Sequence, residues 1–344
     1  MTAKILDIGV DLGFLNNRLN IQFDYFRRVR DGIPEPRYDV LIPNEAGFSL
    51  PKENLKSDMH RGFDASMWTD QINDFNYSVG GNITYSRFWD WEQYKPRFSN
   101  SWDEYRNSIW HRVGYVNWGY EAIGRFDSWE QIANYPVDND RKGNRTVVPG
   151  DIMYKDQNND GVINYLDERP IGYRVDSTPT LNFGINLSAS WKGFDLAMDW
   201  TGSRMTSWNQ CYETARPFQN DGNSPDEVLK DAWHLSDIWD ANSPLIPGKY
   251  PMVRLNTDET SAYDKSSYWL HNVTYLKLRN LEVGYTFPKT WLNRTGISNL
   301  RLFVSGTNLL TLSNLSVMDP ECASDNGLDY PPMRVINIGV NLKF

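Results

Sequence analysis

From Ile336 to Phe344, the sequence alternates strictly between apolar and polar side chains. The apolar residues are Ile336, Ile338, Val340, Leu342 and Phe344, with asparagine, glycine and lysine between them. A period of two indicates a β-strand with two different faces. In a soluble domain such a final strand would leave an aggregation-prone edge. In an outer-membrane barrel the apolar face contacts lipid and the polar face lines a wet lumen.

The same alternation recurs along the chain and predicts about nine strands. Most of them are close to the ~9–11 residues that a tilted strand needs to cross a bilayer. One predicted strand changes phase near Arg279 and Asn280, which indicates a β-bulge. The strands are expected at residues 4–14, 18–28, 60–69, 73–88, 180–191, 193–201, 271–287, 300–308 and 334–344.

The connections between these strands alternate in length. Four are short, at residues 15–17, 70–72, 192–193 and 288–299. Four are long, at residues 29–59, 89–179, 202–270 and 309–333, and all of them fall on the same side of the sheet. Outer-membrane barrels combine short periplasmic turns with longer extracellular loops. The predicted fold class is therefore all-β, an antiparallel transmembrane barrel portion with long extracellular loops.

Composition supports this class and excludes others. The 14 Trp and 19 Tyr suit the aromatic girdles of a barrel, and no apolar run approaches the ~20 residues of a membrane helix. The net charge is −9 without a basic cluster, so nucleic acid is a poor partner. The four histidines are far apart and suggest no zinc site. Cys211 and Cys322 could form a disulfide but define no framework.

Several blocks of the sequence resemble the SusC/RagA-type TonB-dependent transporters of Gram-negative outer membranes. The resemblance covers nearly the whole chain, in the order that family members show. The blocks are Leu15–Leu19 with Asp24–Phe26, Gly150–Asp156 through Asp160–Asn164 with Asp167–Arg169 and Ile171–Gly172, Tyr275–Asn280 with Gly284–Pro288, Leu300–Leu310, Asp319–Glu321, Tyr330–Pro331 and the terminal strand.

This resemblance implies a role and a set of partners. Family members are outer-membrane importers of oligosaccharides or peptides, with a barrel of about 22 strands. A SusD-like surface lipoprotein covers the barrel, and the TonB complex acts through an amino-terminal plug. Residues 1–344 correspond to the carboxy-terminal part of the barrel, so we expect the plug and the signal peptide to be absent from this chain. Asn337, Gly339, Leu342 and Phe344 resemble the signal that the barrel-assembly machinery recognises.

Residues 156–167 carry the clearest ligand pattern. Oxygen-bearing side chains fill positions 1, 3, 5, 9 and 12 of an EF-hand-like loop, with glycine at position 6 and a backbone carbonyl at position 7. The last position is Asp rather than Glu. The alternative is a polar turn without an ion. The sequence predicts one calcium ion held by Asp156, Asn158, Asp160, Val162, Asn164 and Asp167.

The loop at residues 89–135 is rich in aromatic residues. Aromatic rings stack on sugars, anchor partner proteins, or simply fill a loop or a membrane-interface belt. The candidate substrate-binding residues are Trp89, Trp91, Trp102, Trp110, Trp118 and Trp129.

No motif of an enzyme active site is present: the sequence contains no Walker loop, nucleophile elbow or dinucleotide fingerprint. The chain is therefore expected not to be an enzyme. The alternative function is a soluble or surface calcium-dependent glycan-binding or adhesion module. Such modules usually repeat their calcium loops, whereas this chain has one.

Overall fold

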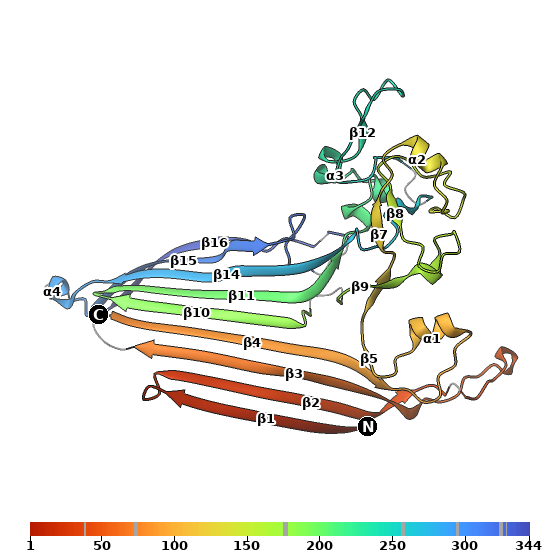
Figure 1. The fold of residues 1–344 in the computed structure, drawn as a ribbon. Helices are drawn as coiled ribbons and strands as arrows, with labels where there is room; N and C mark the ends of the chain where they lie inside the picture. Colours follow the sequence, from red (N-terminus) through yellow and green to blue (C-terminus); the bar gives the residue numbers. More distant parts are fainter. Residues whose placement is uncertain are drawn as a thin grey trace.

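The computed structural model describes residues 1–37, 39–71, 75–174, 178–255, 259–293, 296–322, 326–327 and 329–344. Within these ranges, nine long strands pair antiparallel in chain order to form one sheet (Figure 1). They are β1 (Thr2–Phe14), β2 (Leu19–Glu35), β3 (Glu53–Gln71), β4 (Phe75–Glu92), β10 (Leu181–Trp191), β11 (Phe194–Asn209), β14 (Leu270–Thr286), β15 (Asn299–Ser313) and β16 (Val335–Lys343). The nine predicted strands are confirmed.

Each strand presents one apolar and one polar face, as the alternation predicts. The register places Ile8, Tyr25, Phe63 and Tyr85 in one row across β1 to β4. The rings of Phe63 and Tyr85 stack with centroids 5.7 Å apart. We call the side that carries this row the apolar face. It continues along β10 with Leu181, because this residue pairs with Tyr85.

The β-bulge predicted in β14 is confirmed. On the side of β11, Trp200 pairs with Leu278 and Asp199 pairs with Asn280, so Arg279 is the additional residue. The bulge changes the alternation, and Lys277, Arg279 and Asn280 all hydrogen-bond to carboxylates: Asp319, Glu321 and Asp199 respectively. The bulge therefore concentrates polar side chains on one stretch of the polar face.

The tight turns lie at one end of the sheet and the long connections at the other (Figure 1). Leu15, Asn16 and Asn17 have φ between 54° and 64° in the first turn, and Lys192 with Gly193 forms another. The turn predicted at residues 70–72 includes residue 72, which lies outside the described ranges. Helix α4 (Lys289–Leu292) occupies the fourth short connection. The predicted arrangement of connections is thus confirmed.

Several strands extend farther toward the long connections than the sequence predicts. β2 continues to Glu35, β3 begins at Glu53, and β11 continues to Asn209. The prediction was therefore wrong in assigning residues 29–35, 53–59 and 202–209 to loops. These stretches keep their backbone ladder without alternating hydrophobicity, and alternation was the signal used.

The long connections contain regular structure of their own. The connection from β4 to β10 and the connection from β11 to β14 include three two-stranded pairs, β6 with β9, β7 with β8 and β12 with β13. Their elements are β5 (Arg112–Val113), β6 (Asn117–Gly119), β7 (Ala122–Arg125), β8 (Ile152–Tyr154), β9 (Arg169–Gly172), β12 (His234–Leu235), β13 (Leu245–Ile246), α1 (Ser101–Asn107), α2 (Trp129–Ala133), α3 (Asp226–Lys230) and the 3-10 turns at Tyr165–Asp167, Tyr212–Thr214, Gln219–Asp221 and Ser261–Tyr263. A further 3-10 turn, Asn44–Ala46, lies between β2 and β3.

These two connections share a hydrophobic core. Ile152 and Tyr154 from the first pack with Ala262 and Trp269 from the second, and all four are buried. Two segments far apart in sequence therefore form one packed body at the end of the sheet, which we call the loop body. No helix among the described residues is long and apolar enough to cross a membrane.

Candidate functional site

A cavity of about 880 Å³ lies where β3 and β4 meet the connection from β4 to β10. Arg87, Arg106, Arg112 and Arg174 line it, and Asp90 is the one acidic residue among its described lining residues. Four Phe, Tyr and Trp residues also line it: Phe88, Tyr115, Trp118 and Tyr173. A volume of this size accommodates a ligand of several sugar or amino-acid units.

The aromatic side chains of the cavity are in contact with one another. The ring centroids of Phe88 and Tyr115 lie 5.0 Å apart, and the His60 ring also lies 5.0 Å from Phe88. The Arg174 guanidinium lies 3.9 Å from the centroid of the Tyr115 ring. Flat rings beside cationic donors can stack on a ligand and bind its oxygens at the same time.

The six candidate tryptophans do not form one surface. Trp118 lines the cavity, and Trp102 contacts it edge to face, with ring centroids 6.4 Å apart. Trp110 and Trp129 are more than half exposed and lie elsewhere on the loop body. Trp89 belongs to β4 on the same face as Tyr85, and Trp91 stacks on His111 at 4.1 Å. Of the six, the structure places only Trp118 among the residues that line this cavity.

The loop body is held together by buried polar groups that the sequence did not reveal. Asn139 is fully buried, donates to the Ile152 carbonyl at 3.0 Å and accepts from the Tyr154 amide at 3.0 Å. Asp151 is also fully buried and forms an ion pair with Arg254. Burial raises the pKa of Asp151, and the Arg254 guanidinium opposes that shift. The Asn139 contacts fix the connection from β4 to β10, and the Asp151–Arg254 pair joins it to the connection from β11 to β14.

The calcium candidates form a closed loop whose side chains bind its own backbone. Asp156 accepts hydrogen bonds from the amides of Asn159 and Gly161 at 2.6 and 2.8 Å. Asp160 accepts from the Val162 amide at 2.9 Å. Gly161 has φ +83°, the conformation that glycine permits at this position.

The last position of this loop is the most buried. Asp167 is fully buried, and its two oxygens accept from the Gln157 and Asn164 amides, each at 2.8 Å. The Asn164 side chain donates to the Val162 carbonyl at 3.1 Å. This carbonyl is the predicted calcium ligand at the seventh position of the loop. Among the described residues, no group of three or more His, Cys, Asp or Glu side chains is arranged to hold a metal ion. The proposed set therefore depends on its asparagines and its backbone carbonyl as well as on aspartates.

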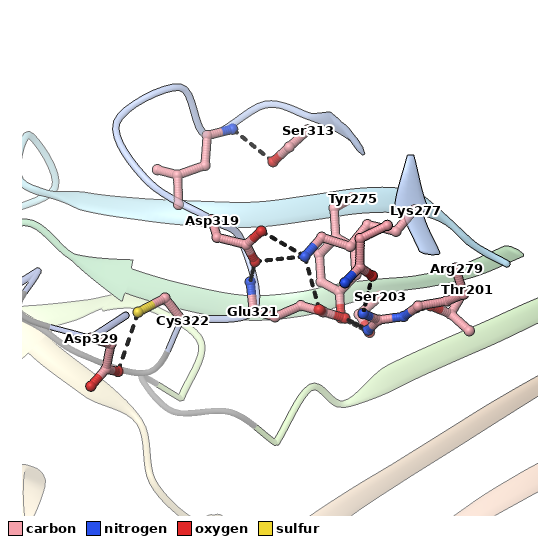
Figure 2. Close-up of polar contacts among 12 residues, drawn as sticks. Thr201, Ser203, Tyr275, Lys277, Arg279, Ser313, Asp319, Glu321, Cys322 and Asp329 are labelled. Carbon is pink, nitrogen blue, oxygen red and sulfur yellow. Dashed lines mark hydrogen bonds and ion pairs between the residues drawn. The ribbon is translucent and has the colours of Figure 1, made fainter. Parts of the chain in front are cut away.

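A second polar cluster joins β14 to the connection that follows β15. Figure 2 shows Lys277 and Arg279 of β14 directed at Asp319 and Glu321. The Lys277 ammonium lies 2.6 and 2.7 Å from the two oxygens of Asp319 and 2.9 Å from Glu321, and Arg279 pairs with the other oxygen of Glu321. Lys277 is only 1% exposed. Two sequence blocks that resembled the importer family are thus direct partners.

The remaining candidates lie at the edge of the sheet. Asn337, Gly339 and Leu342 belong to β16, which pairs only with β15 in the described sheet, and Phe344 follows it. Gly339 pairs with Phe303, whose ring occupies the space that a Cβ would need. The assembly-signal role stays a prediction. Cys322 is a thiol whose Sγ donates to Asp329 at 3.2 Å (Figure 2).

Comparison with known proteins finds similarity to TonB-dependent receptors. No family model matches it. "TonB-dependent receptor P3" of Formosa agariphila is 27% identical over the whole chain, which covers 34% of that protein. "TonB-dependent receptor SusC" of Bacteroides thetaiotaomicron is 24% identical over 98% of the chain, which covers 31% of that protein. The chain is a homologue of the SusC-type TonB-dependent receptors.

Solved structures agree with this assignment at the level of the fold. A structure of the RagAB peptide transporter superposes with a TM-score of 0.67 at 21% identity, over 99% of this chain and 35% of that chain. The RagAB peptide importer in its "open-open" state gives the same TM-score at 22% identity. The chain spans about a third of the length of the curated relatives that it matches. Its nine-stranded sheet has the fold of part of the barrel in these structures.

Proposed function

We propose that this chain forms part of the barrel wall and the extracellular loops of a TonB-dependent importer in the outer membrane of a Gram-negative bacterium. The imported substrate is an oligosaccharide or a peptide. A SusD-like surface lipoprotein is the partner on the loop side, and the TonB complex acts through a plug supplied by other parts of the receptor.

The arrangement of the sheet is the observation that carries this proposal. Its strands have one apolar and one polar face, and all the long connections lie at one end. An apolar face suits contact with lipid, while the loop body at one end suits capture of a substrate outside the cell. The homology to SusC supports the same role.

The cavity supports a substrate that offers both flat surfaces and oxygens. Phe88, Tyr115 and Trp118 provide faces for stacking, and Arg112 provides a guanidinium. Both oligosaccharides and peptides have these features, so the cavity is compatible with either class.

Uptake by intact cells tests the proposal. Cells that carry or lack the gene are given fluorescent pools of oligosaccharides and of peptides, with and without TonB. We expect uptake of one pool to require both the receptor and TonB, and the receptor to remain in carbonate-washed outer membranes. Uptake without the receptor, or a receptor recovered in the soluble fraction, would contradict the proposal.

We also propose that residues 156–167 bind one calcium ion that stabilises the loop body. The oxygen donors are present in EF-hand order, and Asp167 is a buried carboxylate whose hydrogen-bond donors are neutral amides. Binding requires the Asn164 amide to turn away from the Val162 carbonyl, since that carbonyl is a ligand in the proposed set.

Calorimetry on the chelator-treated receptor tests the calcium site. We expect saturable calcium binding that Asp156→Asn weakens strongly, because this side chain occupies the first ligand position. Asp264→Asn is the matched control, since Asp264 is a loop carboxylate that pairs with Arg141 instead. Absence of heat at millimolar calcium, or an equal loss in both variants, would exclude the site.

A further inference from the structure

Three arginines form one row across adjacent strands on the apolar face. Arg27 of β2 pairs with Arg61 of β3, and Arg61 pairs with Arg87 of β4. Neighbouring strands are about 4.8 Å apart, so three like charges lie within roughly 10 Å. Like charges directly opposite one another on a sheet are unfavourable. The row therefore needs a compensating anion.

No carboxylate among the described residues supplies that anion. None of the three arginines forms an ion pair there, whereas Arg30 on the opposite face pairs with Asp58 and nearby Lys4 pairs with Asp31. Asp31 is the acidic residue of β2 nearest to Arg27 on the same face, and it already forms an ion pair with Lys4.

Aromatic rings and sulfur hold Arg27 and Arg61 in place. The Arg27 guanidinium lies 5.4 Å from the Trp91 ring and donates from Nε to the Met59 sulfur at 3.2 Å. The Arg61 guanidinium lies 4.3 Å from the Trp89 ring, and its side chain is exposed. Contacts to a ring face leave the N–H groups of a guanidinium available for a ligand.

A surface groove gives a ligand access to one end of the row. Arg27 and Trp91 line a groove of about 590 Å³ together with Lys4 and Lys56. Asp31 and Glu92 also line it, Asp31 in the ion pair with Lys4. The groove and the cavity described above share no lining residue, and the row runs from Arg27 in the groove to Arg87 at the border of the cavity.

The position of the row identifies the kind of anion. One row nearer the tight turns lie Tyr25, Phe63 and Tyr85, and beyond them the face is apolar. Rows of aromatic residues mark the boundary between hydrocarbon and headgroups in membrane barrels. The arginines follow this boundary on the side of the long loops, at the level of the outer-leaflet headgroups.

We propose that Arg27, Arg61 and Arg87 bind the phosphate groups of a phosphorylated outer-leaflet lipid. Guanidinium groups bind phosphate through paired hydrogen bonds, and a row of three suits a headgroup with two phosphates. The proposal rests on the outer-membrane location proposed above. It adds an attachment site for lipid on the outside of the barrel, next to the substrate cavity that Arg87 also borders.

Lipid retention by the purified receptor tests this site. The receptor is extracted from outer membranes and exchanged into detergent with diphosphorylated lipid A, monophosphorylated lipid A or a phosphate-free glycolipid, and bound lipid is counted by native mass spectrometry. We expect retention in the order of phosphate content. The Arg27→Gln/Arg61→Gln/Arg87→Gln variant should lose roughly tenfold or more in affinity, since its charge-assisted hydrogen bonds are removed.

Controls separate this site from general effects. Arg28→Gln changes a neighbouring arginine of the opposite face, which contacts His60, and should retain lipid normally. Arg61→Lys keeps the charge but not the paired geometry and should give an intermediate loss. Without lipid, the triple glutamine variant should be at least as heat-stable as the parent, because the like charges are gone; a folding defect would instead lower this stability.

The outcomes distinguish the lipid from free phosphate and from failure of the proposed function. Equal retention by the parent and the triple variant, or retention independent of phosphate number, would refute the site. Displacement of lipid by millimolar inorganic phosphate alone would assign the row to free phosphate and also refute it. If the receptor inserts into the outer membrane but retains no lipid, only the lipid site is refuted. If the receptor is absent from the outer membrane, the proposed function is refuted.

Discussion

Removal of the carboxylates around Lys277 should release the connection that follows β15. Lys277 is 1% exposed and contacts Asp319 and Glu321, which are 18% and 21% exposed. Each single change, Asp319→Asn or Glu321→Gln, leaves the ammonium one carboxylate and should cost about 1–2 kcal/mol. The double change leaves a buried ammonium without a counter-charge and should cost about 3–5 kcal/mol.

Hydrogen exchange in the receptor measures this cost locally. The Glu321 amide donates to Asp319 Oδ1 and the Cys322 amide to the Asp319 carbonyl, each at 3.0 Å. In the double variant these two amides should exchange about a hundredfold or more faster, since each 1.4 kcal/mol is a factor of ten. Amides of β10, which lies outside the cluster, provide the internal control.

A third substitution decides whether charge is the cause. Adding Lys277→Met to the double variant replaces the buried ammonium with an apolar side chain of similar length. This triple variant should recover about 2 kcal/mol, because an apolar side chain is tolerated where an unpaired charge is not. If the triple variant exchanges as fast as the double variant, the electrostatic explanation of this cluster is wrong.

Three further predictions concern the loop body, the barrel wall and the cavity. Burial alone would raise the pKa of Asp140, but hydrogen bonds from Thr146 and Lys142 lower it to about 2. The carboxylate should therefore stabilise the loop body by about 2 kcal/mol relative to Asp140→Asn above pH 4, and this stabilisation should be lost as the pH falls toward 2. Unfolding of the loop body measured at several pH values checks this. Gly62→Ala should lower the free energy of unfolding of the barrel by about 1–3 kcal/mol, because a Cβ would lie 1.9 Å from the Tyr85 carbonyl oxygen; Gly81→Ala meets nothing nearer than 3.7 Å and serves as the control in thermal unfolding. Trp118→Ala should reduce substrate binding roughly tenfold in an uptake or binding assay, while Trp129→Ala, outside the cavity, should not.

The sequence predicted the sheet because a membrane imposes a simple rule on it. Each crossing strand contacts lipid on one face and water on the other, so Leu181 to Trp191 alternate without interruption. The same rule located the bulge at Arg279 through the change of phase. Beyond the bilayer both faces of a strand are wet or covered by loops, so the extension of β3 back to Glu53 had no such signal.

The contacts between distant residues could not be predicted in this way. Arg27 and Arg61 become neighbours only through the register of β2 and β3. The loop body depends on Tyr154 meeting Trp269 in one core across a long stretch of sequence. The aromatic loop was recognised from composition, but composition could not show that Trp118 lines a cavity while Trp129 is exposed.

Cysteine labelling in intact cells tests the central claim most directly. Cys211 and Cys322 are replaced by serine, and single cysteines are placed at Trp129 in the loop body or at Asn16 in a tight turn. A membrane-impermeant maleimide should label the cysteine at position 129 in intact cells and the one at position 16 only after lysis, since the two ends of the sheet lie on opposite sides of the outer membrane. Equal labelling of both positions in intact cells would contradict a membrane-spanning sheet.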